Sequence, residues 1–199
     1  LLDITSTANS RVEDSRAYVN SREAYDAHIA QNKEGIRESS AWDYLVLSYD
    51  IHERSELLNT VTSLLDSLPN VNIPAPKSAF GKAVATVEQF AAACGATLHT
   101  AHSHAMPDAA FNLQRAAMLV RWGFTCNMLD QAEWDAFKQQ IWDAWQLYFA
   151  ADGFDKFVYD YLIAVHDFHA EDDLHMVRER LFGIAELQKN NFFTFTWQE

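Results

Sequence analysis

The sequence predicts an all-α fold, a single globular domain of about seven or eight helices. Of its 199 residues, 49% are hydrophobic, which is enough to bury a full core. Glycine (6) and proline (4) are scarce, and this disfavours a turn-rich β-sandwich and favours long helices. Apolar residues also recur at helical spacing between capping residues along most of the chain.

The first helices are predicted from capping residues. Asn20 and Glu23 have the spacing of a capping box, and we expect a helix from there to about Gln31. The apolar run at 41–47 suits either a buried strand or a buried helix. We predict a helix because Ser40 is a capping residue at its start.

A longer helix is predicted from Glu53 to Leu68, with Pro69 as its stop. Its apolar stripe has helical spacing and consists of Leu57, Leu58, Val61, Leu64, Leu65 and Leu68. Three prolines fall within residues 69–76, which favours extended backbone there. A boundary between two helical lobes at 69–77 is an alternative to one continuous domain.

Two helices separated by a loop are predicted for the middle of the chain. The first runs from Ser78 to Cys94, and Gly95 is placed to end it in the left-handed conformation. A loop rich in histidine follows at 97–106. Pro107 is expected to open the second helix and Gly123 to end it. The inward residues of that second helix are predicted to be Phe111, Met118, Leu119 and Trp122.

The last part of the chain is predicted to hold three helices. Asp130 and Glu133 form a second capping box, which begins a helix running to about Phe149. After a break at Asp152-Gly153, the remaining helices are expected at 154–168 and 172–187. In the tail at 192–197, apolar and polar residues alternate after Phe192, so we expect it to be extended.

Five segments, spread over roughly residues 40–168, form one set of motifs: 49–58, 110–115, Gly123, 130–134 and 153–157. Together they resemble the bacterial family designated domain of unknown function 1266. The family pattern reads Trp-x-Ile-x-x-Arg-x-Glu-Leu-Leu, then Ala-Trp-Asp-Leu-x-Arg, a glycine, a capped helix and Ser-Trp-x-x-Phe. The resemblance implies a helical domain of bacterial origin, and it implies no reaction.

This chain departs from the family pattern at three positions. Phe111 and Phe154 stand where the family has tryptophan, and Asn112 stands where it has aspartate. Any acid, base or ligand role of that aspartate is therefore weakened here. Arg115 is retained, and we expect it to form an ion pair inside the core, because a buried guanidinium stays charged. Asp43 and Glu56 are its candidate partners.

The charge of the chain is strongly negative and unevenly distributed. The net charge is −13, and residues 130–173 alone carry eleven acids against two lysines, or −9. Such a surface repels nucleic acid and anionic lipid and attracts basic proteins. The leading hypothesis is a non-enzymatic acidic protein that neutralises a basic partner, as an immunity protein neutralises a toxin domain. The candidate partner-binding residues are Asp143, Asp152, Asp155, Asp160, Asp167, Glu171, Asp172 and Asp173.

Two other functional classes stay open. His99, His102 and His104 lie within six residues and could hold a transition metal, which would suit a metal-binding protein or metal-dependent enzyme. A structural or chaperone-associated helical module is the third possibility, and the acidic stretch would then only keep an aromatic-rich protein in solution. The chain contains no Gly-x-Ser-x-Gly, GxGxxG or P-loop pattern, so we assign no catalytic residue and expect no cofactor.

The remaining observations concern the compartment. Cys94 and Cys126 lie in apolar segments without CxxC spacing, which indicates two thiols in a reducing environment. The sequence shows no basic-then-apolar leader and no run of 18 apolar residues, so we expect a cytoplasmic protein without a membrane segment.

Overall fold

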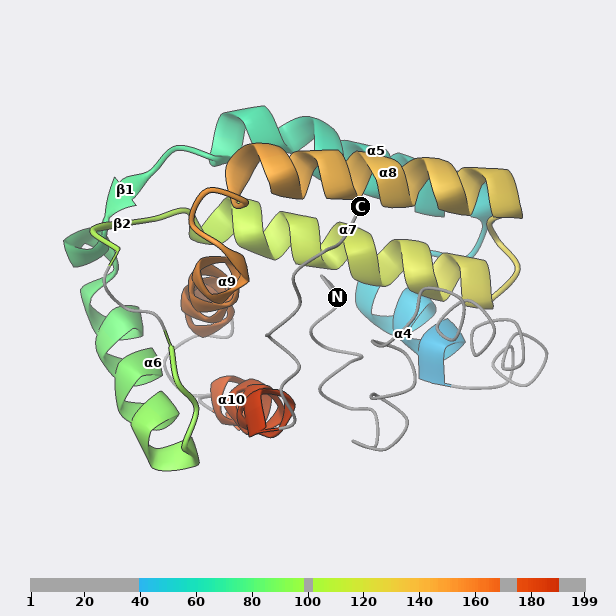
Figure 1. The fold of residues 1–199 in the computed structure, drawn as a ribbon. Coiled ribbons are helices and arrows are strands. Elements are labelled where there is room, and N and C mark those ends of the chain that lie inside the picture. Colours follow the sequence, from blue (N-terminus) through green and yellow to red (C-terminus); the bar gives the residue numbers. More distant parts are fainter. Residues whose placement is uncertain (1–39, 99–101, 169–174, 190–199) are drawn as a thin grey trace.

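The computed structural model describes residues 40–98, 102–168 and 175–189, and they form an all-α domain (Figure 1). The seven α-helices of these residues are α4 (Ser40–Tyr49), α5 (Arg54–Val71), α6 (Gly81–Cys94), α7 (Pro107–Thr125), α8 (Gln131–Tyr148), α9 (Phe154–Phe168) and α10 (His175–Lys189). The predicted fold class is confirmed. The helix expected from Asn20 to Gln31 and the tail at 192–197 lie outside the described residues.

A short antiparallel ribbon interrupts the helices. Strand β1 (Ala75–Pro76) pairs with β2 (His104–Ala105), with Ala75 opposite Ala105. A 3-10 turn, η2 (Lys77–Phe80), leads from β1 into α6. The ribbon brings the residues that precede α6 next to those that precede α7.

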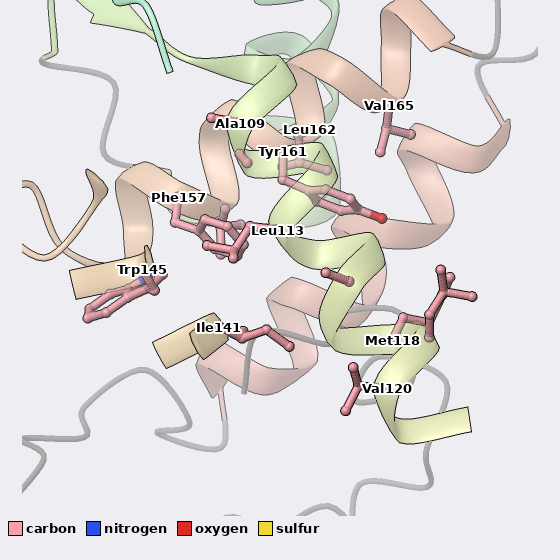
Figure 2. Close-up of a cluster of buried hydrophobic side chains, with 14 of the residues drawn as sticks. Ala109, Leu113, Met118, Val120, Ile141, Trp145, Phe157, Tyr161, Leu162 and Val165 are labelled. Atoms are coloured by element: carbon pink, nitrogen blue, oxygen red, sulfur yellow. The ribbon is translucent and has the colours of Figure 1, made fainter. Parts of the chain in front are cut away.

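Helix α7 is the centre of the fold. Thirteen of its 19 residues are buried, because α5, α8, α9 and α4 all pack against it. In Figure 1, α5 and α8 lie next to each other along one side of α7, while α9 lies on the other side with α6 and α10 beyond it. Figure 2 shows Leu113 and Met118 of α7 in a cluster with Phe157 and Tyr161 of α9.

The apolar core is continuous along the chain. Buried residues from Ala41 in α4 to Ile184 in α10 belong to one cluster, which includes residues on both sides of 69–77. The two parts of the chain that flank this proline-rich segment therefore share one core. In α10, Val177, Leu181 and Ile184 have helical spacing and are buried in the same core.

The prediction that Gly123 ends its helix is wrong. Helix α7 continues to Thr125, and the chain reverses after it through Asn127, whose φ is +59°. Gly123 instead lies on the side of α7 that packs against Leu57 of α5. A Cβ atom at this position would collide with the buried side chain of Leu57. The glycine is thus required for a close helix contact and not for a turn.

Pro69 does not end α5 either. The helix continues two residues further, to Val71, and the N–H of Asn72 closes its last turn by donating to the Leu68 carbonyl at 3.0 Å. Proline removes only its own N–H, which costs one hydrogen bond in the final turn. The expected helix end was therefore early by about one turn.

Other predicted boundaries are confirmed. The Asp130–Glu133 capping box begins α8: the N–H of Glu133 donates to Asp130 Oδ1 at 2.9 Å, and the N–H of Asp130 donates to Glu133 Oε2 at 3.0 Å. Gly95 ends α6 in the left-handed conformation, with φ +74°, and α9 spans the predicted 154–168. Local capping chemistry was sufficient to place these ends.

Candidate functional site

Two charged residues are buried inside α9. Lys156 and Asp160 are one turn apart, and their exposed fractions are 2% and 0%. The Lys156 ammonium donates to Asp160 Oδ2, and the main-chain N–H of Met106 donates to the same oxygen at 2.9 Å. Asp160 therefore ties α9 to the start of α7. The expectation that Asp160 belongs to an exposed acidic surface is wrong, because apolar residues surround it on a helix that is buried on nearly all sides.

Burial governs the electrostatics of Asp160. Desolvation raises the pKa of its carboxyl above the ordinary value, while Lys156, the Met106 N–H and the nearby His102 each offset part of the rise. Its second oxygen, Oδ1, is buried and has no hydrogen-bond partner within the part of the chain that the structure describes. Within the described residues, the hydrogen bonds to this carboxyl therefore all go to Oδ2.

A second polar group lies next to this pair. The Tyr159 hydroxyl donates to Glu88 Oε1 at 2.9 Å, and the Lys77 ammonium donates to the same oxygen at 3.1 Å. Lys77 also lies 4.9 Å from the centroid of the Tyr159 ring. Burial raises the pKa of the Tyr159 hydroxyl well above its ordinary value, and Glu88 adds to the rise. These contacts join η2, α6 and α9, so we interpret the group as structural.

The histidine loop is only partly described. His99 lies outside the described residues. His102 Nδ1 is 3.7 Å from Asp152 Oδ1, and His104 Nδ1 forms a 2.8 Å hydrogen bond with Ser103 Oγ. Among residues 40–98, 102–168 and 175–189, no group of three or more His, Cys, Asp or Glu side chains is arranged to hold a metal ion.

Arg115 lies against aromatic rings. Its guanidinium carbon is 5.2 Å from the centroid of Tyr49 and 5.4 Å from that of Phe111. Within the described ranges the structure shows no ion pair from Arg115 to Asp43 or Glu56, and Glu56 accepts the main-chain N–H groups at the start of α5 instead. The expected core ion pair is therefore replaced by cation–π contacts, which a half-buried guanidinium can make at low desolvation cost.

Asn112, the departure from the family pattern, has a contact of its own. Its side-chain amide donates to Ser67 Oγ at 3.1 Å and so connects α7 to α5. On the neighbouring helix pair, Arg54 of α5 donates to Glu133 of α8. Asn112, Arg54 and Glu133 all belong to the segments that resemble the family, and in this structure each connects two packed helices.

Four of the predicted partner-binding acids are exposed, namely Asp143, Asp152, Asp155 and Asp167. Three of them also have a polar neighbour, and that of Asp152 is His102. Asp143 accepts from the Gln139 amide at 2.8 Å, and Asp167 Oδ1 lies 3.3 Å from His166 Nδ1. Glu171, Asp172 and Asp173 fall outside the described residues.

A groove of about 220 Å³ lies between α5 and α8. Asp66 of α5 and Asp143 of α8 both line it, and Leu147, which also lines it, is 73% exposed. In Figure 1 both helices run in the same direction, so their carboxyl ends lie together near this groove. The lining residues are Leu65, Asp66, Leu68, Pro69, Gln140, Asp143, Ala144, Leu147 and Tyr148.

Sequence reasoning missed Asp66 and the buried role of Lys156. Asp66 follows an apolar stripe and resembles an ordinary solvated residue. For Lys156, one signal was present: residues 157–165 are apolar on every face of the helix except at Asp160. A helix that is apolar all round is buried, and its charged residues then need partners inside the protein.

Comparison with known proteins identifies no relative: no family model matches the chain, and no curated protein or solved structure matches it significantly. In the described residues, none of the helices has the length and apolar character that a membrane span requires.

Proposed function

We propose that this protein is a non-enzymatic binding protein, which holds a basic protein partner through an acidic surface. The surface is formed by the carboxyl-terminal half of α8, the turn that follows it and the first turn of α9, and Asp167 adds a carboxylate at the far end of α9. Its described carboxylates are those of Asp143, Asp152, Asp155 and Asp167.

The observation that carries the proposal concerns the two lysines of this segment. Lys138 pairs with Asp135 at 2.9 Å and lies 4.8 Å from the ring centroid of Trp134. Lys156 is buried against Asp160. Both lysines of this segment are therefore engaged with aspartates inside it, Lys138 with Asp135 and Lys156 with Asp160. The field of this surface is correspondingly negative.

A surface of this kind favours a cationic partner in two ways: it raises the rate of association, and it discriminates against partners of like charge. Neither effect requires a catalytic group. An immunity protein that neutralises a basic toxin domain would use such a surface. This role would place the protein in the compartment where the toxin is made or acts, which we propose to be the cytoplasm.

The test is a salt-stepped affinity experiment. Purified protein is immobilised, bacterial extract is applied at low salt, and the proteins that elute at rising salt are identified. A cationic protein recovered in this way is purified and titrated from about 0.1 M to about 1 M salt, where the Debye length falls from about 10 Å to about 3 Å. We expect the affinity to fall steeply over that range. An affinity that does not change with salt would overturn the proposal.

A matched pair of variants makes this test specific. Asp152→Asn with Asp155→Asn removes two charges from the proposed surface, whereas Asp43→Asn with Asp50→Asn removes two exposed charges elsewhere on the molecule. We expect the first pair to weaken binding about tenfold and the second to have little effect. Equal losses from both pairs would show that only the overall charge matters.

A further inference from the structure

The groove between α5 and α8 combines apolar and acidic walls. Leu65 and Leu147 supply apolar surface, while Asp66 and Asp143 supply a carboxylate from each helix. Its volume of about 220 Å³ lies below the roughly 300–1,000 Å³ of small-molecule sites, so it suits a single side chain better than a metabolite.

The electrostatics of the groove favour a cation. Helices α5 and α8 both end beside it, and neither has a basic residue in its last turn. The carboxyl end of a helix carries a partial negative charge, and here two such ends add to two carboxylates. An exposed, partly apolar groove with this potential is complementary to a long cationic side chain.

We propose that this groove receives an arginine side chain of the basic partner, with Asp66 of α5 and Asp143 of α8 binding the guanidinium. This inference rests on the proposed function, because it names how that partner is held. The arginine stem lies along Leu147, and the planar head faces Tyr148. The five N–H groups of arginine serve several acceptors at once and its plane stacks on an aromatic ring, whereas lysine offers one compact charge.

The first experiment uses a defined probe. Isotope-labelled full-length protein is titrated with a short amidated peptide in which one arginine stands between two leucines. The matched peptides carry lysine or citrulline at that position, and citrulline keeps the shape of arginine but has no charge. We expect amide shifts at 65–68 and 143–148 with the arginine peptide, weaker shifts with lysine and none with citrulline. Equal shifts with arginine and citrulline would overturn the inference.

The second experiment uses the cationic partner recovered by salt-stepped affinity. Asp66→Asn with Asp143→Asn is expected to weaken its binding at least about tenfold, and Leu147→Ala several-fold. All three positions line an open groove, so folding is monitored by circular dichroism and thermal melting of each variant.

The outcomes separate this inference from the proposed function. If the partner binds with strong salt dependence and Asp152→Asn with Asp155→Asn weakens it, while the groove variants do not, the acidic surface stands and the groove inference fails. If the partner binding is insensitive to salt, the proposed function fails, and the peptide titration still decides whether the groove takes arginine. A wild-type dimer that Leu147→Ala dissociates would assign the groove to a second copy of the chain and overturn the inference.

Discussion

The main-chain N–H of Met106 donates to Asp160 Oδ2 at 2.9 Å, across 54 residues of sequence. The same oxygen accepts from Lys156, so one buried carboxylate fixes both the start of α7 and the first turns of α9. Charges in such a position cost desolvation energy and require their partners. Measurable consequences for stability follow from this arrangement.

Lys156→Met should destabilise the protein by roughly 3–5 kcal/mol at neutral pH, because it leaves the Asp160 carboxylate buried without its cation. Adding Asp160→Asn should recover most of this loss, since an amide oxygen still accepts from Met106. Urea unfolding of both variants measures the free energies. A double variant no more stable than Lys156→Met alone would contradict the view that an unpaired charge causes the loss.

The pH dependence of stability should reveal Asp160 itself. Burial raises its pKa in the folded state, so its contribution to folding is fully present below the ordinary aspartate pKa of about 3.9 and is lost as the pH rises through the raised value. Asp160→Asn lacks this contribution. We therefore expect the stability of the wild type relative to Asp160→Asn to decrease from pH 3 toward neutrality, measured by urea unfolding at about one-unit steps. A relative stability that increases with pH would mean that the ion pair with Lys156 outweighs burial.

Tyr159→Phe should show the corresponding effect at alkaline pH. The variant loses the hydrogen bond to Glu88, and we expect a cost of about 1–2 kcal/mol at pH 8. Because the pKa of Tyr159 is raised in the folded state, the wild type loses this advantage as the pH rises above about 10. Unfolding at pH 8 and above pH 10 tests this, with Tyr44→Phe, at an exposed ring, as the control. A difference in unfolding free energy between the wild type and Tyr159→Phe that is the same at both pH values would contradict the raised pKa.

Gly123→Ala should destabilise the protein by about 1–3 kcal/mol, because the added methyl group collides with Leu57. The helical preference of alanine over glycine offsets part of that cost. Gly81→Ala is the matched control: nothing lies within 4 Å of the added atom, so no loss of stability is expected. In a Leu57→Ala background, the cost of Gly123→Ala should largely disappear. Thermal unfolding of the wild type, Gly123→Ala, Leu57→Ala and the double variant measures this coupling. Additive effects of the two substitutions would argue against a direct contact.

The helices of this fold could be predicted from sequence wherever their ends are set locally. The Asp130–Glu133 box and Gly95 act through their own main-chain neighbours, and both were placed correctly. Gly123 and Pro69 were misjudged because the same residue types also serve close packing or fit into a final turn. Which of these applies depends on contacts with distant parts of the chain.

The candidate sites were less predictable for a similar reason. Lys156 and Asp160 have the four-residue spacing of an ordinary exposed pair, and only the apolar surroundings on α9 reveal their burial. Asp66 and Asp143 lie on different helices, and both line one groove because α5 and α8 are parallel neighbours. That arrangement follows from how both helices pack on α7, which no local pattern encodes.

The central position of α7 has a consequence for synthesis on the ribosome. Helices α4 and α5 bury their apolar faces against α7, which follows them in the chain. A nascent chain that has emerged only as far as residue 106 exposes Leu45, Leu57 and Val61, which this later helix covers in the finished protein. Stable packing of the described domain therefore waits until translation has delivered Pro107–Thr125, and the nascent chain needs protection from aggregation until then.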